Sequence, residues 1–208
     1  MTATSPANPL ELVLASGNAG KRREIEAICA PLGIVVRTAA ELGFTEDIPE
    51  TGDTFEENAR LKACAVAQAL GRPALADDSG LVVAALGGRP GVYSARYAGR
   101  SHDDLANNRK LRQEMAEVPD GSRQAAFVCV MCCCRRGGLV LQARGTLEGV
   151  IAREPAGENG FGYDPLFFLP ERGLTVAQLP AGEKNQISHR ARALAALAPQ
   201  LADFLQRD

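Results

Sequence analysis

The chain has 208 residues, of which 46% are hydrophobic and 23% are charged, and its formal net charge is −2. This is the balance of a globular protein with a sizeable core. Proteins that bind nucleic-acid backbones usually carry an excess of Lys and Arg, so this composition argues against nucleic acid as a partner. No apolar run approaches the roughly 20 residues of a membrane helix, which argues against a membrane partner.

The start of the chain, residues 1–9, is short and polar and lacks the basic start and the apolar core of a signal peptide. We expect these residues to form a disordered lead and the protein to be cytoplasmic. Residues 10–208 have the length of a single domain, which a cleft could divide into two lobes.

The first predicted strand, residues 10–15, is followed by a helix that Asn18 caps and that runs to about Ala30. Small residues form the turn between them, beginning at Ser16, and the first turn of the helix carries Lys21. That end of a helix normally favours acidic side chains. Small residues and a cation at a helix start are typical of a phosphate site. The plain alternative is a solvated basic patch.

A second strand is predicted at residues 34–37, and Asp53 with Glu56 forms a predicted capping box for a helix to about Leu70. Lys62 falls within the apolar arc of that helix. A buried lysine is costly unless it is paired. Either Lys62 extends past the edge of the helix to solvent, or it reaches a polar cleft and meets phosphate or carboxylate. The residue pattern leaves both explanations open.

Two adjacent carboxylates, Asp77 and Asp78, interrupt an apolar stretch, and we expect them in a turn between short strands at residues 74–76 and 81–84. Burying either carboxylate without a partner costs several kcal/mol. A divalent ion removes that cost, because Mg²⁺ takes one or two carboxylates and fills its other positions with water and phosphate. The alternative is an ordinary surface turn, since Asp, Ser and Gly are common there. The apolar flanks favour the metal site.

The middle of the chain continues with a loop rich in Gly and Pro at residues 86–99. Ser101 and Asp104 form a predicted capping pair for a helix to about Glu117. Residues 161–169 have the composition of a strand. Because predicted helices and strands are mixed along the chain, the class is α/β, with a mixed central sheet flanked by helices.

A hairpin is predicted from residues 124–135 and 139–148, turning at two glycines. The first of these strands carries four of the six cysteines. Cys129 and Cys132 have the spacing of half a zinc site, but no second pair is suitably spaced. We expect the cysteines to be buried apolar residues of a strand, and we expect no disulfides in a reducing cytosol.

The last predicted helix is capped by Ser188 and ends near Gln206. It begins with His189 and Arg190, so cations again occupy the end where the helix dipole disfavours them. An anion or a polar ligand explains this pair better than a structural role.

Several segments in this order resemble the inosine triphosphate pyrophosphatase family, the non-canonical purine nucleoside triphosphate pyrophosphatases. The resemblance runs from about residue 11 to residue 205. It is carried by LASGNAGK (14–21), ETGDTFEENA (50–59), ADDSGL (76–81), the loop GGRPGVYSARY (87–97), GFGYDP (160–165) and SHR (188–190).

The resemblance implies an enzyme that hydrolyses ITP, dITP and XTP to the monophosphate and pyrophosphate and so removes damaged nucleotides. It implies an α/β fold with a long sheet and a cleft between two lobes, a need for Mg²⁺, and a homodimer. Nucleoside triphosphate is then the small-molecule partner.

Site roles also follow from the resemblance. Asp78 matches the catalytic proton acceptor and a metal ligand, Asp77 supports the metal, and Glu50 matches a further acidic ligand. The implied substrate-binding residues are Ser16, Asn18, Lys21, Lys62 and Ser79 on the phosphate side, Phe161, Gly162, Tyr163 and Asp164 in the base-binding segment, and Lys184, His189 and Arg190 in the rest of the nucleotide pocket.

Selectivity is predicted to rest on the 6-oxo group of the base. Donors such as backbone N–H groups or Arg190 would accept hypoxanthine or xanthine and would meet the adenine amino group donor to donor. Three other functions are weaker alternatives: a nucleotide sensor without catalysis, a general nucleotide phosphatase, and a zinc module built on Cys129–Cys134. The presence of Glu50, Asp77 and Asp78 argues against the sensor.

Overall fold

The computed structural model describes residues 10–206 and contains a seven-stranded sheet of order β2-β1-β3-β4-β5-β6-β7. β1 pairs in parallel with β2 and β3, and the other neighbours are antiparallel, so the predicted mixed sheet is confirmed. The predicted lead at residues 1–9 lies outside the described residues. The strands are β1 (Leu10–Leu14), β2 (Ile34–Thr38), β3 (Ala74–Val83), β4 (Gln124–Cys134), β5 (Val140–Ile151), β6 (Phe167–Leu169) and β7 (Leu174–Thr175).

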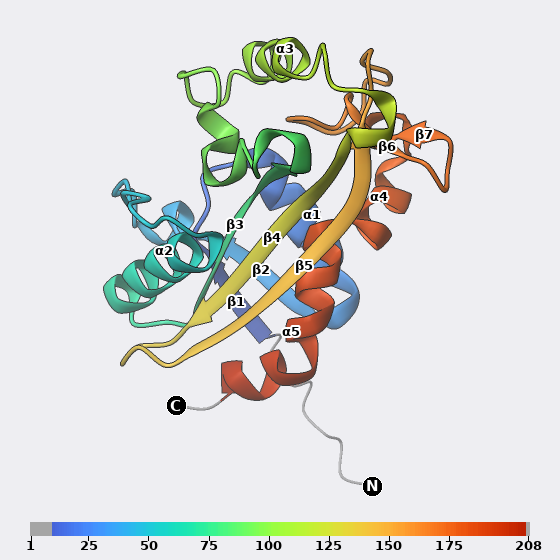
Figure 1. The fold of residues 1–208 in the computed structure, drawn as a ribbon. Helices are drawn as coiled ribbons and strands as arrows, with labels where there is room; N and C mark the ends of the chain where they lie inside the picture. Colours follow the sequence, from blue (N-terminus) through green and yellow to red (C-terminus); the bar gives the residue numbers. More distant parts are fainter. Residues whose placement is uncertain (1–9, 207–208) are drawn as a thin grey trace, which may run out of the picture.

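Helices cover both faces of the sheet. α2 packs against β3 and β4 on one face, and α5 packs against β5 and β4 on the other, beside α1 (Figure 1). None of the helices within residues 10–206 is both long and apolar enough to cross a membrane. The helices are α1 (Ala19–Cys29), α2 (Phe55–Leu70), α3 (Asp104–Glu114), α4 (Ala181–Ile187), which was not predicted, and α5 (His189–Gln206).

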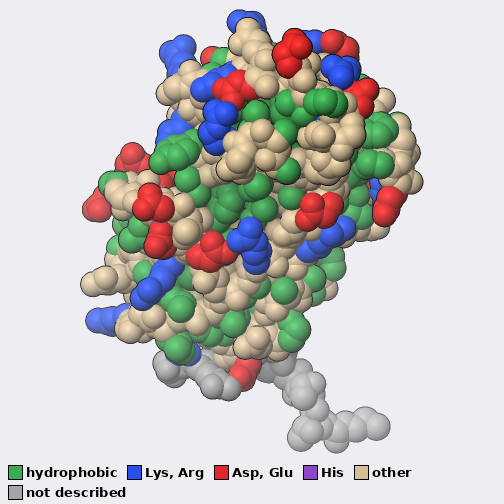
Figure 2. All heavy atoms as spheres, viewed as in Figure 1, with side chains coloured by type: hydrophobic (Ala, Val, Ile, Leu, Met, Phe, Trp, Pro, Cys, Tyr) green, Lys and Arg blue, Asp and Glu red, His purple; other side chains and the backbone are tan. Residues whose placement is uncertain are grey.

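The core is divided into three clusters that define two lobes. In the first lobe one cluster lies between the sheet and α2, around Val66, and another lies between the sheet and α1 and α5, around Ile25. The third cluster, which includes Leu111 and Phe167, forms the second lobe at the far end of β3–β5, where α3 and β6 lie (Figure 1). Acidic and basic side chains are intermixed on the face of the described residues shown in Figure 2.

The predicted acidic turn is wrong. Asp77 and Asp78 lie inside the continuous strand β3, because each of its residues pairs with β4, Asp77 opposite Met131 and Asp78 opposite Val130. Successive side chains of a strand point to opposite faces of the sheet. The two carboxylates therefore face different helices, although they are neighbours in sequence.

The start of α2 is one residue later than predicted. Thr54, not Asp53, is the N-cap, since its hydroxyl accepts the Glu57 N–H at 3.2 Å and the Glu57 carboxylate accepts the Thr54 N–H at 3.2 Å. The capping box therefore uses Glu57 instead of Glu56. Thr54 has an extended backbone, which makes it the last residue before the helix.

The predicted boundaries of one helix and one strand in the second lobe were also wrong. Asp103, not Ser101, caps α3, because its carboxylate accepts the Ala106 N–H at 3.0 Å, and the helix ends at Glu114, earlier than expected. The strand predicted at residues 161–169 is confined to β6. The preceding residues form turns that bring polar groups to the cavity described below.

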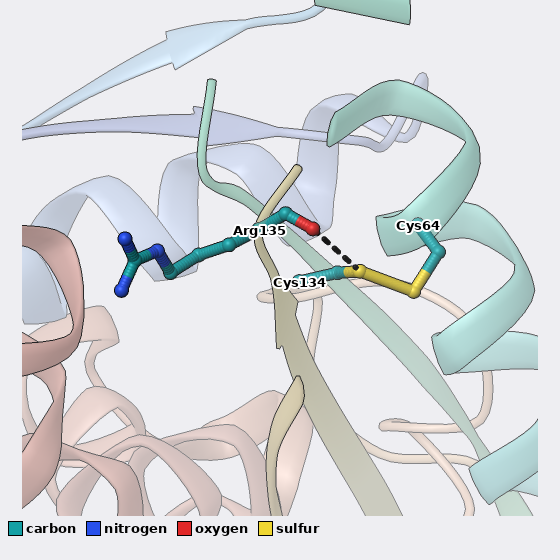
Figure 3. Close-up of a disulfide and its surroundings, with 3 residues drawn as sticks. All are labelled: Cys64, Cys134 and Arg135. Atoms are coloured by element: carbon teal, nitrogen blue, oxygen red, sulfur yellow. Dashed lines mark hydrogen bonds between the residues drawn. A yellow bond between two sulfur atoms is a disulfide. The ribbon is translucent and has the colours of Figure 1, made fainter. Parts of the chain in front are cut away.

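The prediction that disulfides are absent is also wrong. Cys64 of α2 and Cys134 at the end of β4 form a disulfide, with their Cα atoms 5.1 Å apart (Figure 3). The packing of α2 on the sheet brings the two together across 70 residues of sequence. Cys134 Sγ lies 3.6 Å from the Arg135 carbonyl oxygen, a contact that is a hydrogen bond only when Cys134 is a thiol, because a disulfide sulfur has no hydrogen to donate.

The remaining cysteines of β4 are buried in the core, as expected. Cys129 belongs to the cluster on the α5 side of the sheet and Cys132 to the cluster on the α2 side. The two thiols of this C-x-x-C sequence therefore point to opposite faces of the strand. This geometry argues against the zinc module. The free cysteines are Cys29, Cys129, Cys132 and Cys133.

Candidate active site

A cavity of about 710 Å³ lies between the two lobes. It brings together residues from both, including all but one of the predicted site residues. Asp77 is the exception, since it is not among the described residues that line the cavity. The predicted residues that line it are Ser16, Asn18, Lys21, Glu50, Lys62, Asp78, Ser79, Phe161, Gly162, Tyr163, Asp164, Lys184, His189 and Arg190.

The turn between β1 and α1 forms one wall. Asn18 caps α1 as predicted, since its side-chain oxygen accepts the Lys21 N–H at 3.0 Å. The Ser16 hydroxyl accepts the Asn18 N–H at 3.3 Å. The Lys21 ammonium extends to Asp77 Oδ2, at 3.0 Å. The turn thus presents a helix N-terminus and a cation to the cavity, which suits a phosphate group.

Asp77 lies behind the cavity wall in a cluster of cations. Its Oδ2 is 3.3 Å from Arg190 Nε and also accepts the Ser79 hydroxyl at 3.0 Å. Burial by itself would raise the pKa of Asp77, but the charges of Lys21 and Arg190 outweigh it and hold that pKa well below its usual value. Asp77 is therefore ionised and paired at neutral pH.

Asp78 lies on the other face of the sheet and points toward α2. Its Oδ1 is 3.5 Å from the Lys62 ammonium, which lies 2.5 Å from Glu50 Oε1. Burial raises the pKa of Asp78, Lys62 opposes that effect, and the nearby negative charges of Glu50 and Asp77 add to it. Of the two neighbouring carboxylates, Asp78 is thus the one with the greater affinity for a proton.

Lys62 enters the polar cavity instead of extending past the helix edge to solvent. Burial would lower its pKa, but Asp78, Asp77 and Glu50 outweigh burial and raise it. Lys62 therefore stays charged and provides a partly buried cation among three carboxylates.

Two carboxylate oxygens in this region are buried without a hydrogen-bond partner, Asp77 Oδ1 and Asp78 Oδ2. Such orphaned acceptors are costly and are open to a cation. Within residues 10–206 there is no group of three or more His, Cys, Asp or Glu side chains arranged to hold a metal ion. A divalent ion here would take few protein ligands and complete its shell with water or phosphate, as Mg²⁺ commonly does.

Another part of the cavity lining carries an aromatic ring against cations. The Phe161 ring centroid lies 4.7 Å from Lys184 Nζ and 5.3 Å from Arg190 Cζ. The backbone around the ring is held by Asp164, whose Oδ2 accepts the Phe161 N–H at 2.9 Å and the Lys184 ammonium at 2.6 Å. An aromatic face with nearby polar groups suits a planar heterocycle.

Glu24 of α1 is a site residue that sequence reasoning missed. It is 7% exposed, and its carboxylate binds Lys184 at 2.6 Å and Arg190 at 2.7 Å. The signal in the sequence is an acidic side chain next to Ile25, on the buried side of a helix. That is the same kind of misplaced charge that singled out Lys62.

His189 is neutral. Burial, with the adjacent charges of Arg190 and Lys184, lowers its pKa well below the usual value. Its ring stacks on Phe127 with centroids 5.0 Å apart, and Nδ1 is buried without a partner. A neutral imidazole can accept as well as donate a hydrogen bond. Phe127 also lines the cavity and was not predicted.

Other cavity residues missed by sequence reasoning come from loops and from the ends of short helices. They include Phe44, Arg96, Ser101, His102 and Asp104. His102 has a φ of 61°, in the left-handed region that non-glycine residues rarely adopt. Loop conformation is decided by distant packing, so no local pattern in the sequence identified these positions.

Comparison with known proteins is consistent with this geometry. The chain is 52% identical over 195 residues to a dITP/XTP pyrophosphatase of Geobacillus kaustophilus, covering 94% of this chain and 96% of that protein. It is 49% identical over 191 residues to the dITP/XTP pyrophosphatase of Bacillus subtilis, with coverage of 92% and 96%.

Two solved structures have the same fold. The Ham1 protein of Staphylococcus aureus superposes with a TM-score of 0.82 and a HAM1 protein of Coxiella burnetii with 0.84; each is 44% identical and covers 93% of this chain and 99% of its own. These likenesses confirm the resemblance drawn from the sequence and the predicted fold. Residues 12–200 match the Ham1 family, and the chain therefore belongs to that family.

Proposed function

We propose that this protein hydrolyses the non-canonical purine nucleoside triphosphates ITP, dITP and XTP to the monophosphate and pyrophosphate. The observation that carries the proposal is a single cavity whose lining combines Asp78 and Lys62 with the aromatic ring of Phe161. Such a site suits a molecule with a polyphosphate at one end and a purine at the other. The relatives named dITP/XTP pyrophosphatase support the same substrate class.

In the proposed reaction Asp78 accepts the proton of a water molecule that attacks the α-phosphorus. The bond from that phosphorus to the bridging oxygen breaks, and pyrophosphate leaves. Lys62, together with Lys21 and the turn at Ser16 and Asn18, binds the phosphates and offsets the charge that develops on them. Asp77 is not the base, because its cationic partners lower its pKa.

Mg²⁺ is the cofactor in this proposal. Asp78 would hold it through the unpartnered Oδ2, with Glu50 as a further acidic ligand from the cavity lining and Asp77 in support. Glu50 Oε1 is paired with Lys62 here, so a ligand role for that oxygen requires Lys62 to turn toward the phosphates. The ion would supply positive charge at the reacting phosphate.

Base selection rests on donors aimed at the 6-oxo group. Arg190 donates to Asp77, Glu24 and Ser79, and its two terminal nitrogens each retain a second N–H. Those N–H groups, with the backbone N–H groups nearby, would bind hypoxanthine or xanthine and meet the adenine amino group donor to donor. GTP shares the 6-oxo group, so its exclusion rests on the 2-position.

The test is a panel of ITP, dITP, XTP, GTP and ATP incubated with the protein and Mg²⁺, with pyrophosphate and orthophosphate measured separately. We expect pyrophosphate from ITP, dITP and XTP and little from ATP or GTP. Orthophosphate as the first product would make the protein a phosphatase. Binding of ITP without turnover would make it a sensor.

The proposal includes a homodimer in the cytoplasm, as the family resemblance implies for an enzyme that acts on the nucleotide pool. Light scattering after gel filtration would give the mass, which is 22.0 kDa for one chain. A mass of one chain at assay concentration would contradict the homodimer.

A further inference from the structure

Helix α3 holds the backbone of Gly162 from both sides. The Asp104 carboxylate accepts the Gly162 N–H at 2.7 Å, and the Asn108 amide donates to the Gly162 carbonyl oxygen, also at 2.7 Å. Gly162 has a φ of +64°, and a Cβ there would meet no atom within 4 Å. The glycine is thus explained by its backbone conformation, which the two α3 side chains hold in place.

Phe161 immediately precedes Gly162 in the chain, and its ring lies at the boundary between the lobes. A Cβ added to Gly20 of α1 would lie 2.8 Å from Phe161 Cδ1, so the ring packs directly on the first turn of that helix. The Phe161 N–H is held by Asp164 at 2.9 Å. The segment is therefore tied to α3 at Gly162 and to Asp164 at Phe161, and together these contacts set the direction of the ring.

Asn108 is not explained by the needs of its own helix. Asn is a poor helix former, and the Asn108 amide also donates to the Asp104 carbonyl at 2.9 Å, a local bond that competes with the helix ladder. Its Oδ1 is buried without a partner, which is a further cost. The hydrogen bond to the Gly162 carbonyl oxygen gives Asn108 a role outside its own helix.

We propose that Asp104 and Asn108 are positioning residues that hold Phe161 for recognition of the nucleobase. This inference rests on the proposed function, since it assigns these residues to binding of the nucleobase in the same cavity. The proposed function assigns the phosphates to other side chains, among them Asp78 and Lys62. Loss of either contact lets the Gly162 backbone move and the ring leave its place against the base.

The experiment measures ITP hydrolysis by D104A, D104N, N108A and the control Q113A, whose side chain is exposed on the same helix. We expect D104A and N108A each to raise KM about fivefold to tenfold, the worth of roughly one hydrogen bond, with kcat nearly unchanged. D104N keeps an acceptor oxygen for the Gly162 N–H, so it restores most of the affinity. Q113A behaves as wild type.

Inorganic tripolyphosphate separates positioning from general damage, because it has phosphates but no base. Its inhibition constant should not change in D104A or N108A. In an F161A background, N108A should have little further effect on KM, because the two changes act through the same ring. Equal losses for tripolyphosphate and ITP, or full additivity with F161A, would overturn the inference.

The wild-type protein in the same assay distinguishes the two proposals. If it releases no pyrophosphate from ITP, the proposed function fails and this inference fails with it. If it is active while D104A and N108A keep the wild-type KM, only the positioning role is overturned.

Discussion

Arg190 Nε lies 3.3 Å from Asp77 Oδ2, although 113 residues separate the two in the chain. The same guanidinium binds Glu24 at 2.7 Å and Ser79 at 2.8 Å, so α5, α1 and β3 are tied together behind the cavity. Asp77 Oδ2 is thereby committed to structural ion pairs. Asp78, on the other face of the strand, remains available for chemistry.

The first prediction concerns Asp78. D78N should lower kcat for ITP at least about a hundredfold, because an amide cannot accept the proton of the attacking water. The folded state should survive, since the side chain keeps its size. The matched control is D53N, an exposed carboxylate at the start of α2, which should retain full activity. Thermal unfolding and steady-state kinetics check both variants, and near-wild-type turnover by D78N would remove Asp78 from the mechanism.

A second prediction concerns the dependence of stability on pH. Burial raises the pKa of Glu24, but Arg190 and Lys184 outweigh it, so the folded-state pKa is lowered from the ordinary 4.5. A lowered carboxylate pKa contributes stability above the unfolded value, and that contribution is lost as pH falls through the folded value. E24Q should therefore be less stable than wild type at pH 7 and should lose less stability on acidification below pH 4.5.

Denaturant unfolding at neutral and acidic pH measures this difference. E117Q, a change at an exposed position of the second lobe, serves as the control and should follow the wild-type curve. An E24Q curve parallel to that of wild type across the acidic range would show that Glu24 does not carry this linkage.

A third prediction concerns the disulfide. Closing a loop of 70 residues stabilises the folded state by up to about 4 kcal/mol through the entropy of the unfolded chain. Reductant should therefore lower the unfolding midpoint of wild type and leave that of C64A unchanged. Of the six cysteines, the four free ones should titrate as thiols in denaturant before reduction, and all six afterwards. Six thiols before reduction would mean that the bridge is absent in the purified protein.

A fourth prediction concerns the metal. Chelation with EDTA should abolish pyrophosphate release from ITP, and excess Mg²⁺ should restore it, because few protein ligands are available and the ion exchanges freely. D78N should bind Mg²⁺ more weakly in a calorimetric titration without nucleotide. Full activity in EDTA would contradict the role of a divalent ion.

The sequence by itself predicts the features that depend on local chemistry. The cation after the Asn18 cap, the lysine within the apolar arc of α2 and the acid pair within an apolar run are visible because each violates a local preference. Each was found at the cavity wall or directly behind it. The mixed α/β class follows in the same way from the succession of helical and strand patterns.

Packing between distant segments determined the rest. Pairing with β4 makes Asp77 and Asp78 part of one strand, and strand alternation then gives them opposite surroundings and opposite pKa shifts. The Cys64–Cys134 bridge and the hold of α3 on Gly162 join residues far apart in the chain. Such contacts depend on how helices and loops dock on the sheet, and a local pattern of residues does not contain that information.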